Sequence, residues 1–487
     1  MKLFLSAALA AACLTGYAQD FPGYRTGNYT GVNSVFYNPA NIADSRYRWD
    51  FNLLSVGTGV GNSQASFKLK DMFSGSLTED SIKNKIFGNQ AGPESGSFNL
   101  TVGGPAILFN LNSKSSIALT SRARMMMNVD NLDGKLANQL LNDGIDDNSF
   151  PYTIASSQNM RMSVNAWSEF GGTYARVLSN KGPHFMKAGL TVKYLAGVLN
   201  AYINVDHLNS TLNLEQPSGN VYMNNTTGSI GMGFGGIHLS NVAASDLTKF
   251  KSSGFGFDLG FVYEFRPKYG EYRDEVTGDE CRNLNKYKLK AGLALLDIGT
   301  VKYERDVQRS GDYALNITGA KKFYLNQLDT AEIDNYKQFF DNRPQYFTPQ
   351  GNNNAGSYKV PLPSTLQLDL DYHFNKGFYI NLAGQFSLAS NKAYAAHYYR
   401  SFTVTPRFEG KGFGLYVPVN YSQLTKLNAG LSLRAGPLFL GSGSLLSALF
   451  KDSRQADFFF GLHFGGLQHK PKQKVSKPET PAGEPAQ

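Results

Sequence analysis

Residues 363–388 read PSTLQLDLDYHFNKGFYINLAGQFSL, and this stretch decides the fold. Apolar and polar side chains alternate along two arms, which are joined by Asn375-Lys376-Gly377. A period of two is the pattern of a β-strand with one apolar and one polar face. The glycine in the link favours a tight hairpin. Each arm has about ten residues, which is the length that a tilted strand needs to cross a bilayer.

The same alternation recurs along most of the chain and predicts a sheet of many strands. Helical spacing interrupts it at 77–87, 132–141 and 330–340, which we interpret as parts of long inserts in the loops of one rim, at 73–90, 130–150 and 325–356. We predict strands that begin at Trp49 and then lie at 97–110, 114–124, 161–178, 185–199, 200–214, 221–232, 253–266, 285–298, 311–319, 364–375, 377–389, 398–408, 412–421, 425–435 and 456–464.

The N-terminus has the pattern of a secretory signal peptide, with a basic start, an apolar run and small residues before a cleavage point after Ala18. A lipoprotein modified at Cys13 is the alternative. The region after the signal keeps only Cys281, so it forms no internal disulfide. The net charge of +9 is scattered, and we predict no binding to nucleic acid. The last residues, 469–487, are rich in Pro, Lys and Glu and are predicted to be disordered.

The composition favours a membrane-spanning barrel over a soluble sheet. Only 17% of the residues are charged, and the chain has 34 Phe, 27 Tyr and 50 Gly. After the signal, no apolar run reaches the ~18 residues of a membrane helix. A chain that spans a bilayer without helices must close its sheet, because every backbone polar group needs a partner. We therefore predict an all-β, transmembrane antiparallel β-barrel of about 14 strands, with a range of 12 to 16, in the outer membrane of a Gram-negative bacterium. A soluble β-sandwich or propeller is the alternative.

The segment before the first strand carries a family resemblance. Asn38, Pro39 and Ala40 follow a polar, Gly-containing stretch and resemble the Asn-Pro-Ala element of the FadL/PorV-like outer-membrane β-barrel superfamily. The resemblance implies that 19–48 forms a hatch inside the lumen and that 49–468 forms the barrel. Three longer strings, at 31–47, 295–303 and 434–438, resemble a Bacteroidota branch of that superfamily whose function is unknown.

Several charged side chains are predicted by parity to face the lumen. We expect them to form ion pairs with one another, to fix the hatch at 19–48 in place and to line a water-containing interior. The alternative is a path for polar solutes through the barrel, in which the like charges of Asp369 and Asp371 attract a cation. The candidates are Arg122, Arg124, Glu169, Asp369, Asp371 and Arg434, together with Lys193, Asp258, Glu264, Lys288 and Lys290.

The sequence contains no pattern of an enzyme. The seven His are dispersed, and neither a metal-ligand spacing nor a Gly-x-Ser-x-Gly elbow is present. We predict no catalysis, no metal and no cofactor.

The resemblance implies a passive transporter of small hydrophobic solutes, although the sequence reveals no extended apolar groove. A non-transporting accessory barrel of a secretion or outer-membrane assembly complex is the first alternative, and a structural porin is the second. The expected partners are outer-membrane lipid, hydrophobic small molecules and other outer-membrane or secretion-system proteins.

Overall fold

The structure is a computed structural model that describes residues 21–68, 70, 85, 93–142, 149–156, 159–237, 252–273, 280–330, 335–351 and 356–468. The predicted signal peptide, the predicted helix at 77–87 apart from residue 85, and the predicted tail at 469–487 lie outside the described residues. Among the described residues, the peptide bonds Phe150-Pro151 and Gln216-Pro217 are cis.

The sheet closes into the predicted antiparallel barrel of 14 strands. Closure occurs where β1 (Tyr47–Asn62) pairs with β23 (Gln455–Leu467) along almost its whole length. Some of the 14 positions around the ring are filled by two shorter strands in succession. From β1 the ring runs through β2 (Pro93–Gly103) and β3 (Ala106–Asn110), β4 (Ser115–Asp133), β6 (Met160–Lys181), β7 (His184–Glu215), β9 (Ser252–Phe265), β10 (Leu289–Glu304), β14 (Ser357–Pro361) and β15 (Thr365–Asn375), β16 (Phe378–Ser387), β17 (Ser401–Glu409), β18 (Phe413–Tyr416) and β19 (Val419–Ser422), β20 (Lys426–Ala429) and β21 (Leu431–Ala435), and β22 (Leu438–Ser442) to β23.

The hairpin quoted above is confirmed as β15 and β16, which pair from Thr365↔Ser387 to Asn375↔Phe378. Some of the strand predictions need correction. The ranges 185–199 and 200–214 form the single strand β7. The range 97–110 is divided into β2 and β3 at Gly104-Pro105, 412–421 is divided into β18 and β19 at Val417-Pro418, and 425–435 is divided into β20 and β21 at Gly430. Proline has no N–H to give to the ladder, which explains the breaks at Pro105 and Pro418. The strand β22 was not predicted.

A belt of exposed apolar side chains surrounds the barrel, and we call it the lipid-facing belt. On β9, for example, Phe255, Phe257 and Leu259 are exposed, whereas Asp258 between them is buried. Large apolar groups outside and polar groups inside are the arrangement of an outer-membrane barrel. Other members of the belt are Leu119, Phe170, Tyr174, Leu190, Val192, Tyr194, Leu293, Leu368, Leu370, Leu382, Phe402, Phe408, Tyr421, Phe458 and Phe464.

The described helices are too short or too polar to cross a membrane by themselves. Among the described residues, the longest helix is α4 (Gly134–Asn142), which has nine residues.

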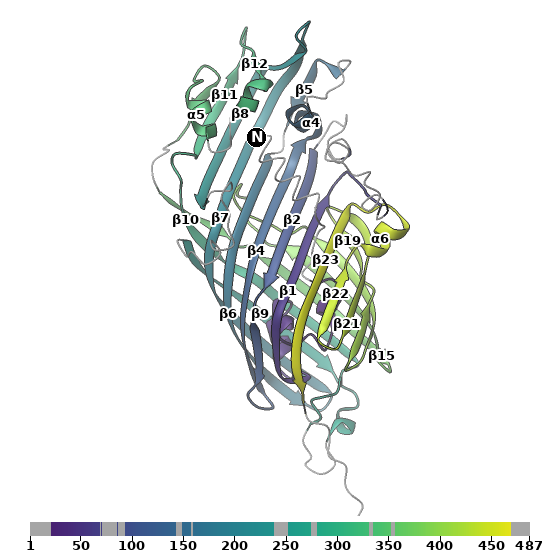
Figure 1. Cartoon of the computed structure of the whole chain (residues 1–487). Helices are drawn as coiled ribbons and strands as arrows, with labels where there is room; N and C mark the ends of the chain where they lie inside the picture. The colour runs from purple at the N-terminus through teal and green to yellow at the C-terminus, as the bar shows by residue number, and fades with distance from the viewer. Residues whose placement is uncertain are drawn as a thin grey trace, which may run out of the picture.

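Strands on one side of the barrel continue far above the lipid-facing belt and form an upper lobe (Figure 1). The strand β7 alone has 32 residues, and its upper half pairs with β8 (Asn220–Gly236) instead of β9. The predicted helix at 132–141 is confirmed by α4. The predicted helix at 330–340 ends in α5 (Tyr336–Asp341), and its residues 331–334 lie outside the described part. The lobe also contains β5 (Tyr152–Ala155), β11 (Gly311–Ile317), β12 (Phe323–Tyr324), η8 (Leu325–Thr330) and β13 (Phe347–Pro349).

Candidate functional site

The segment from residue 21 to residue 46 lies inside the barrel, and we call it the inner segment. It consists of the short 3-10 turns η1 (Tyr24–Thr26), η2 (Gly31–Phe36) and η3 (Pro39–Ile42). It contacts opposite sides of the wall. The ring of Tyr24 stacks on Phe439 of β22 at 4.1 Å, and the N–H of Val32 donates to Asp50 Oδ1 of β1 at 2.7 Å. Lys187 Nζ of β7 donates to the carbonyl of Ala43 at 2.9 Å. Whether this segment acts as a hatch stays a prediction.

Asn38, Pro39 and Ala40 pack on two glycines of the wall. The side chain of Asn38 accepts a hydrogen bond from the N–H of Ala40 at 3.0 Å, which caps η3. Gly189 of β7 and Gly260 of β9 are register partners directly beneath this turn. A Cβ at Gly189 would lie 2.5 Å from the backbone carbon of Pro39, and one at Gly260 would lie 2.1 Å from Asn38 Oδ1. Only glycine allows this close approach of two backbones.

Six buried charged side chains form a compact group on the inner wall, which we call the lumen cluster: Arg122, Arg124, Glu169, Lys193, Asp258 and Asp297. Arg122 and Arg124 each reach Glu169 at 2.8 Å. Lys193 Nζ lies 2.7 Å from Asp258 and 2.6 Å from Asp297. Three positive and three negative groups make the cluster neutral, so each charge is compensated inside the barrel.

The other predicted lumen residues are distributed between separate groups. Asp371 accepts two hydrogen bonds from Arg407, at 2.8 and 2.7 Å, and Lys290 lies 3.6 Å from it. Arg434 donates to the backbone carbonyls of the turn after β17. Asp369 is half-buried and lies in register with Gly292 of β10. The structure therefore brings Arg122, Arg124 and Glu169 together, but Asp369, Asp371 and Arg434 lie in other surroundings.

The prediction that Lys288 faces the lumen is wrong. Its Nζ donates to the carbonyl of Phe374 at 3.0 Å and lies over the ring of Tyr372, which is exposed on the outside. Its neighbour Tyr287 is buried instead and donates to Asp371 at 2.7 Å. The predicted strand began at residue 285, but β10 begins only at Leu289, so the alternation that assigned Lys288 to the lumen does not apply there.

The connection between β16 and β17 contacts the lumen-facing side chains of β4. The N–H of His397 donates to Asn128 Oδ1 at 3.0 Å. Arg124 donates to the hydroxyl of Tyr398 at 2.7 Å, and the hydroxyl of Tyr399 donates to Asp130 at 2.9 Å. Two cavities of about 30 Å³ each, one lined by both polar and apolar side chains and one mostly polar, lie among the inner segment and the wall. The described residues thus fill the lumen with side chains from below, from above and from the wall.

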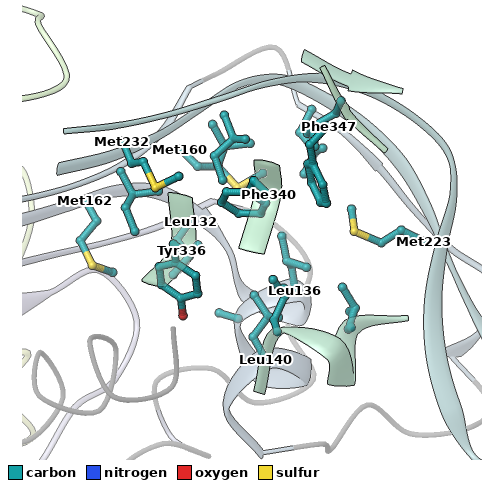
Figure 2. Close-up of a pocket in the computed structure, with 18 of the residues that line it drawn as sticks. Leu132, Leu136, Leu140, Met160, Met162, Met223, Met232, Tyr336, Phe340 and Phe347 are labelled. Carbon is teal, nitrogen blue, oxygen red and sulfur yellow. The ribbon is translucent and has the colours of Figure 1, made fainter. Parts of the chain in front are cut away.

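A different kind of space lies in the upper lobe. A cavity of about 150 Å³ is lined by the strands β4, β6, β7, β8, β11, β12 and β13 and by the helical segments α4, η8 and α5 (Figure 2). Every lining residue except Arg161 is apolar or aromatic. They are Val129, Leu132, Leu136, Ala137, Leu140, Met160, Met162, Ile203, Val205, Leu208, Met223, Ile230, Met232, Leu315, Ile317, Phe323, Leu325, Leu328, Tyr336, Phe340 and Phe347.

The cavity lies on the face of the sheet that turns away from the lumen. Arg122 and Arg124 of β4 point into the lumen, so the odd-numbered residues of this strand occupy its outer face. Among these, Leu119 is 64% exposed in the lipid-facing belt. Ten residues further along, Val129 lines the cavity. One face of the same strand therefore meets lipid below and the cavity above.

A family model described as "Family of unknown function (DUF5723)" matches residues 39–443. The chain belongs to this family. No curated protein matches the sequence.

Solved structures that resemble this DUF5723 member include FadL-type barrels. A FadL homologue of Pseudomonas aeruginosa is 11% identical, with a TM-score of 0.42 over 93% of this chain and 98% of that chain. The toluene transporter TbuX of Ralstonia pickettii is 12% identical, with a TM-score of 0.40 over 93% and 99%. The toluene transporter TodX of P. putida is 11% identical, with a TM-score of 0.41 over 91% and 95%. Likeness at this level leaves the function of the chain open.

The sequence did not reveal the cavity of this DUF5723 member. Its walls come from strands and helices between residues 129 and 347. The apolar residues that face it alternate along the strands in the same way as those that face lipid. The run Met125-Met126-Met127 with Met160 and Met162 is the one unusual signal, because methionine is favoured at adaptable apolar surfaces. Among the described residues, no group of three or more His, Cys, Asp or Glu is placed to hold a metal ion.

Proposed function

We propose that this outer-membrane β-barrel protein passively transports small hydrophobic molecules and captures them in the apolar cavity of the upper lobe. The cavity is the observation that carries the proposal. An apolar space of this size stays dry and accepts apolar guests, as a cavity of ~150 Å³ engineered in another protein binds benzene or xenon.

The lining defines the class of ligand. A charged or strongly polar molecule would lose its hydration without gaining partners, because the walls offer almost no polar atoms. The volume of about 150 Å³ suits one aromatic ring or a short alkyl group. Met160, Met162, Met223 and Met232 have flexible side chains that adapt to differently shaped guests. We therefore propose ligands that are selected by apolarity and size, not by hydrogen bonds.

The filled lumen favours a second candidate, the accessory barrel that does not transport. A barrel whose interior is occupied by the inner segment and the lumen cluster needs no path through its centre. Crosslinking from α4 and α5, followed by mass spectrometry, separates the two candidates, since an accessory barrel should yield a stoichiometric protein partner. A structural porin would pass a steady ionic current as a purified single channel, whereas the transporter should pass almost none.

Binding to a cavity-filled variant tests the proposal. Ala137 is fully buried on α4 and lines the cavity, so Ala137→Phe places a ring in the space that the ligand would occupy. Ala314 is half-buried on β11, next in sequence to the lining residue Leu315 but on the opposite face of the strand, and Ala314→Phe is the matched control. Both variants should retain the band shift of a folded barrel in electrophoresis.

We expect the wild type and Ala314→Phe to bind fluorobenzene in detergent with equal affinity, and Ala137→Phe to bind it at least tenfold more weakly. Uptake of apolar compounds by a deletion strain should be restored by the first two and not by the third. Equal binding by all three proteins, or uptake that is unchanged by the deletion across a broad panel of apolar compounds, would contradict the proposal.

A further inference from the structure

We infer that the ligand moves between the cavity and the membrane lipid next to the upper lobe along the outer face of β2 and β4, without entering the lumen. This inference rests on the proposed function. The molecule that would follow this route is small, uncharged and apolar, and it is dissolved in the lipid.

The first step of the reasoning is the strand register, which places belt and cavity on one continuous face. Phe170 and Tyr194 of the belt are register partners on β6 and β7. Ser168 and Ala196 form the next outward pair above them, and Ala166 and Leu199 form the pair after that. Ala123 of β4 is the partner of Ser168 and extends the row. The small side chains of Ala123, Ser168 and Ala196 thus separate the exposed aromatic rows of the belt from the core of the upper lobe, which begins with Ala166 and Leu199.

The second step concerns exposure along β2 and β4. Their outward residues pair as Val102↔Ala123, Leu100↔Met125 and Phe98↔Met127, and we call these six residues the outer track. All except the buried Met127 are half-buried, so their apolar surface is accessible in part. Phe98 and Met125 pack against the apolar core that surrounds the cavity. The track therefore continues the lipid-facing belt as far as Val129 at the cavity wall.

The third step is a groove at the foot of the outer track. It has a volume of about 470 Å³ and is lined by Leu119, Ser121, Phe170 and Pro105 among others. The groove lies where the sheet is interrupted between β2 and β3. The N–H of Gly104 still donates to the carbonyl of Ser121 at 2.9 Å, and the hydroxyl of Ser121 donates to the carbonyl of Pro105 at 2.9 Å, so the interruption is a fixed feature. Ser121 lies in this groove, and Ala123 of the track follows two residues later on the same face.

The fourth step is the comparison with a route through the lumen. From the cavity, a ligand would have to cross the sheet itself, because the lumen lies on the other face of β4, β6 and β7. It would then meet the lumen cluster, in which Lys193, Asp258 and Asp297 are joined at 2.7 Å or less. An apolar molecule would break these ion pairs without replacing them. The outer track instead offers apolar contact along roughly 30 Å of strand.

The experiment measures exchange and affinity separately, with fluorobenzene as the probe. Fluorine NMR of the protein in lipid nanodiscs gives the rate at which the probe exchanges between lipid and cavity, and titration in detergent gives its affinity. Ala123→Trp places an indole across the outer track, and Val102→Trp does the same from the facing strand. Ala291→Trp is the matched control, because Ala291 is also a half-buried, lipid-facing alanine but lies on β10.

A disulfide tests the lumen route in the same assay. A Cβ at Gly443 would lie 3.1 Å from that of Pro22, so a small outward shift reaches the roughly 3.5–4.5 Å that disulfides require. Pro22→Cys with Gly443→Cys, in a Cys281→Ala background, therefore ties the inner segment to the wall, and reduction releases it.

We expect Ala123→Trp and Val102→Trp to slow exchange at least tenfold with unchanged affinity in detergent, and Ala291→Trp and the oxidised disulfide to leave both quantities unchanged. Exchange that is unaffected by both track variants, or slowed by the disulfide and restored by reduction, would overturn the inference while the proposed function stands. Absence of any bound probe in the wild type would overturn both.

Discussion

Removal of one charge from the lumen cluster should show how much this cluster contributes to the stability of the folded barrel. Lys193 is 3% exposed and contacts Asp258 at 2.7 Å, Asp297 at 2.6 Å and Glu169 at 3.8 Å. Lys193→Met changes the net charge of the cluster from zero to −1 at a buried site. Leaving a buried charge uncompensated costs about 3–5 kcal/mol, and we expect Lys193→Met to destabilise the folded barrel by that amount.

A second substitution should recover most of this loss. Asp258→Asn returns the cluster of Lys193→Met to neutrality, and the amide oxygen can still accept the hydrogen bond that the N–H of Asp297 donates at 2.7 Å. The double variant should lie within about 2 kcal/mol of the wild type, because neutral replacements of buried ion pairs are tolerated. Urea-dependent unfolding in lipid vesicles, followed by the electrophoretic band shift, measures both values. A loss below 1 kcal/mol for Lys193→Met, or a double variant less stable than the single one, would refute this reasoning.

Two further predictions concern the inner segment and the upper lobe. Gly189→Ala forces a Cβ into the backbone of Pro39 and should lower the free energy of unfolding by about 1–3 kcal/mol, the usual range for overpacking. Gly172→Ala is the control, because a Cβ there would meet nothing within 4 Å, and it should unfold like the wild type in the same urea assay. At the upper end of β2, above the lipid-facing belt, burial and the neighbouring Asp133 raise the pKa of Glu94 from 4.5 to about 7. Because the folded protein then binds this proton more tightly than the unfolded chain, stability falls as the pH rises from 4.5 to about 7. Glu94→Gln should therefore stabilise the protein at pH 8 by about 1–2 kcal/mol after solvent screening, and thermal unfolding at pH 4 should show no gain.

The number and type of strands could be predicted because lipid imposes a strict alternation on each of them. The hairpin from Thr365 to Ser387 follows this rule without interruption. The division of β7 into two predicted strands failed at a bulge, where Ala166 faces Leu199 but Trp167 faces Gly197. The bulge shifts the alternation by one residue, which resembles a strand end in the sequence.

The charged residues of the lumen could be predicted by parity, but their partners could not. The pairing of Arg122 with Glu169 depends on the register of β4 and β6, which single-strand patterns do not contain. Asp297 was missed because it lies at a bulge of β10, where its φ of 59° turns it out of the regular alternation and toward Lys193. The cavity was missed because outward apolar residues alternate identically whether lipid or α4 and α5 cover them.

The most direct measurement is the position of an iodobenzene molecule in crystals of the wild-type protein, read from the anomalous signal of iodine. Our account predicts a peak between Met162, Met232 and Phe340 in the upper lobe, with no peak among the side chains of the lumen cluster. An empty cavity in crystals that show iodine inside the barrel would contradict it.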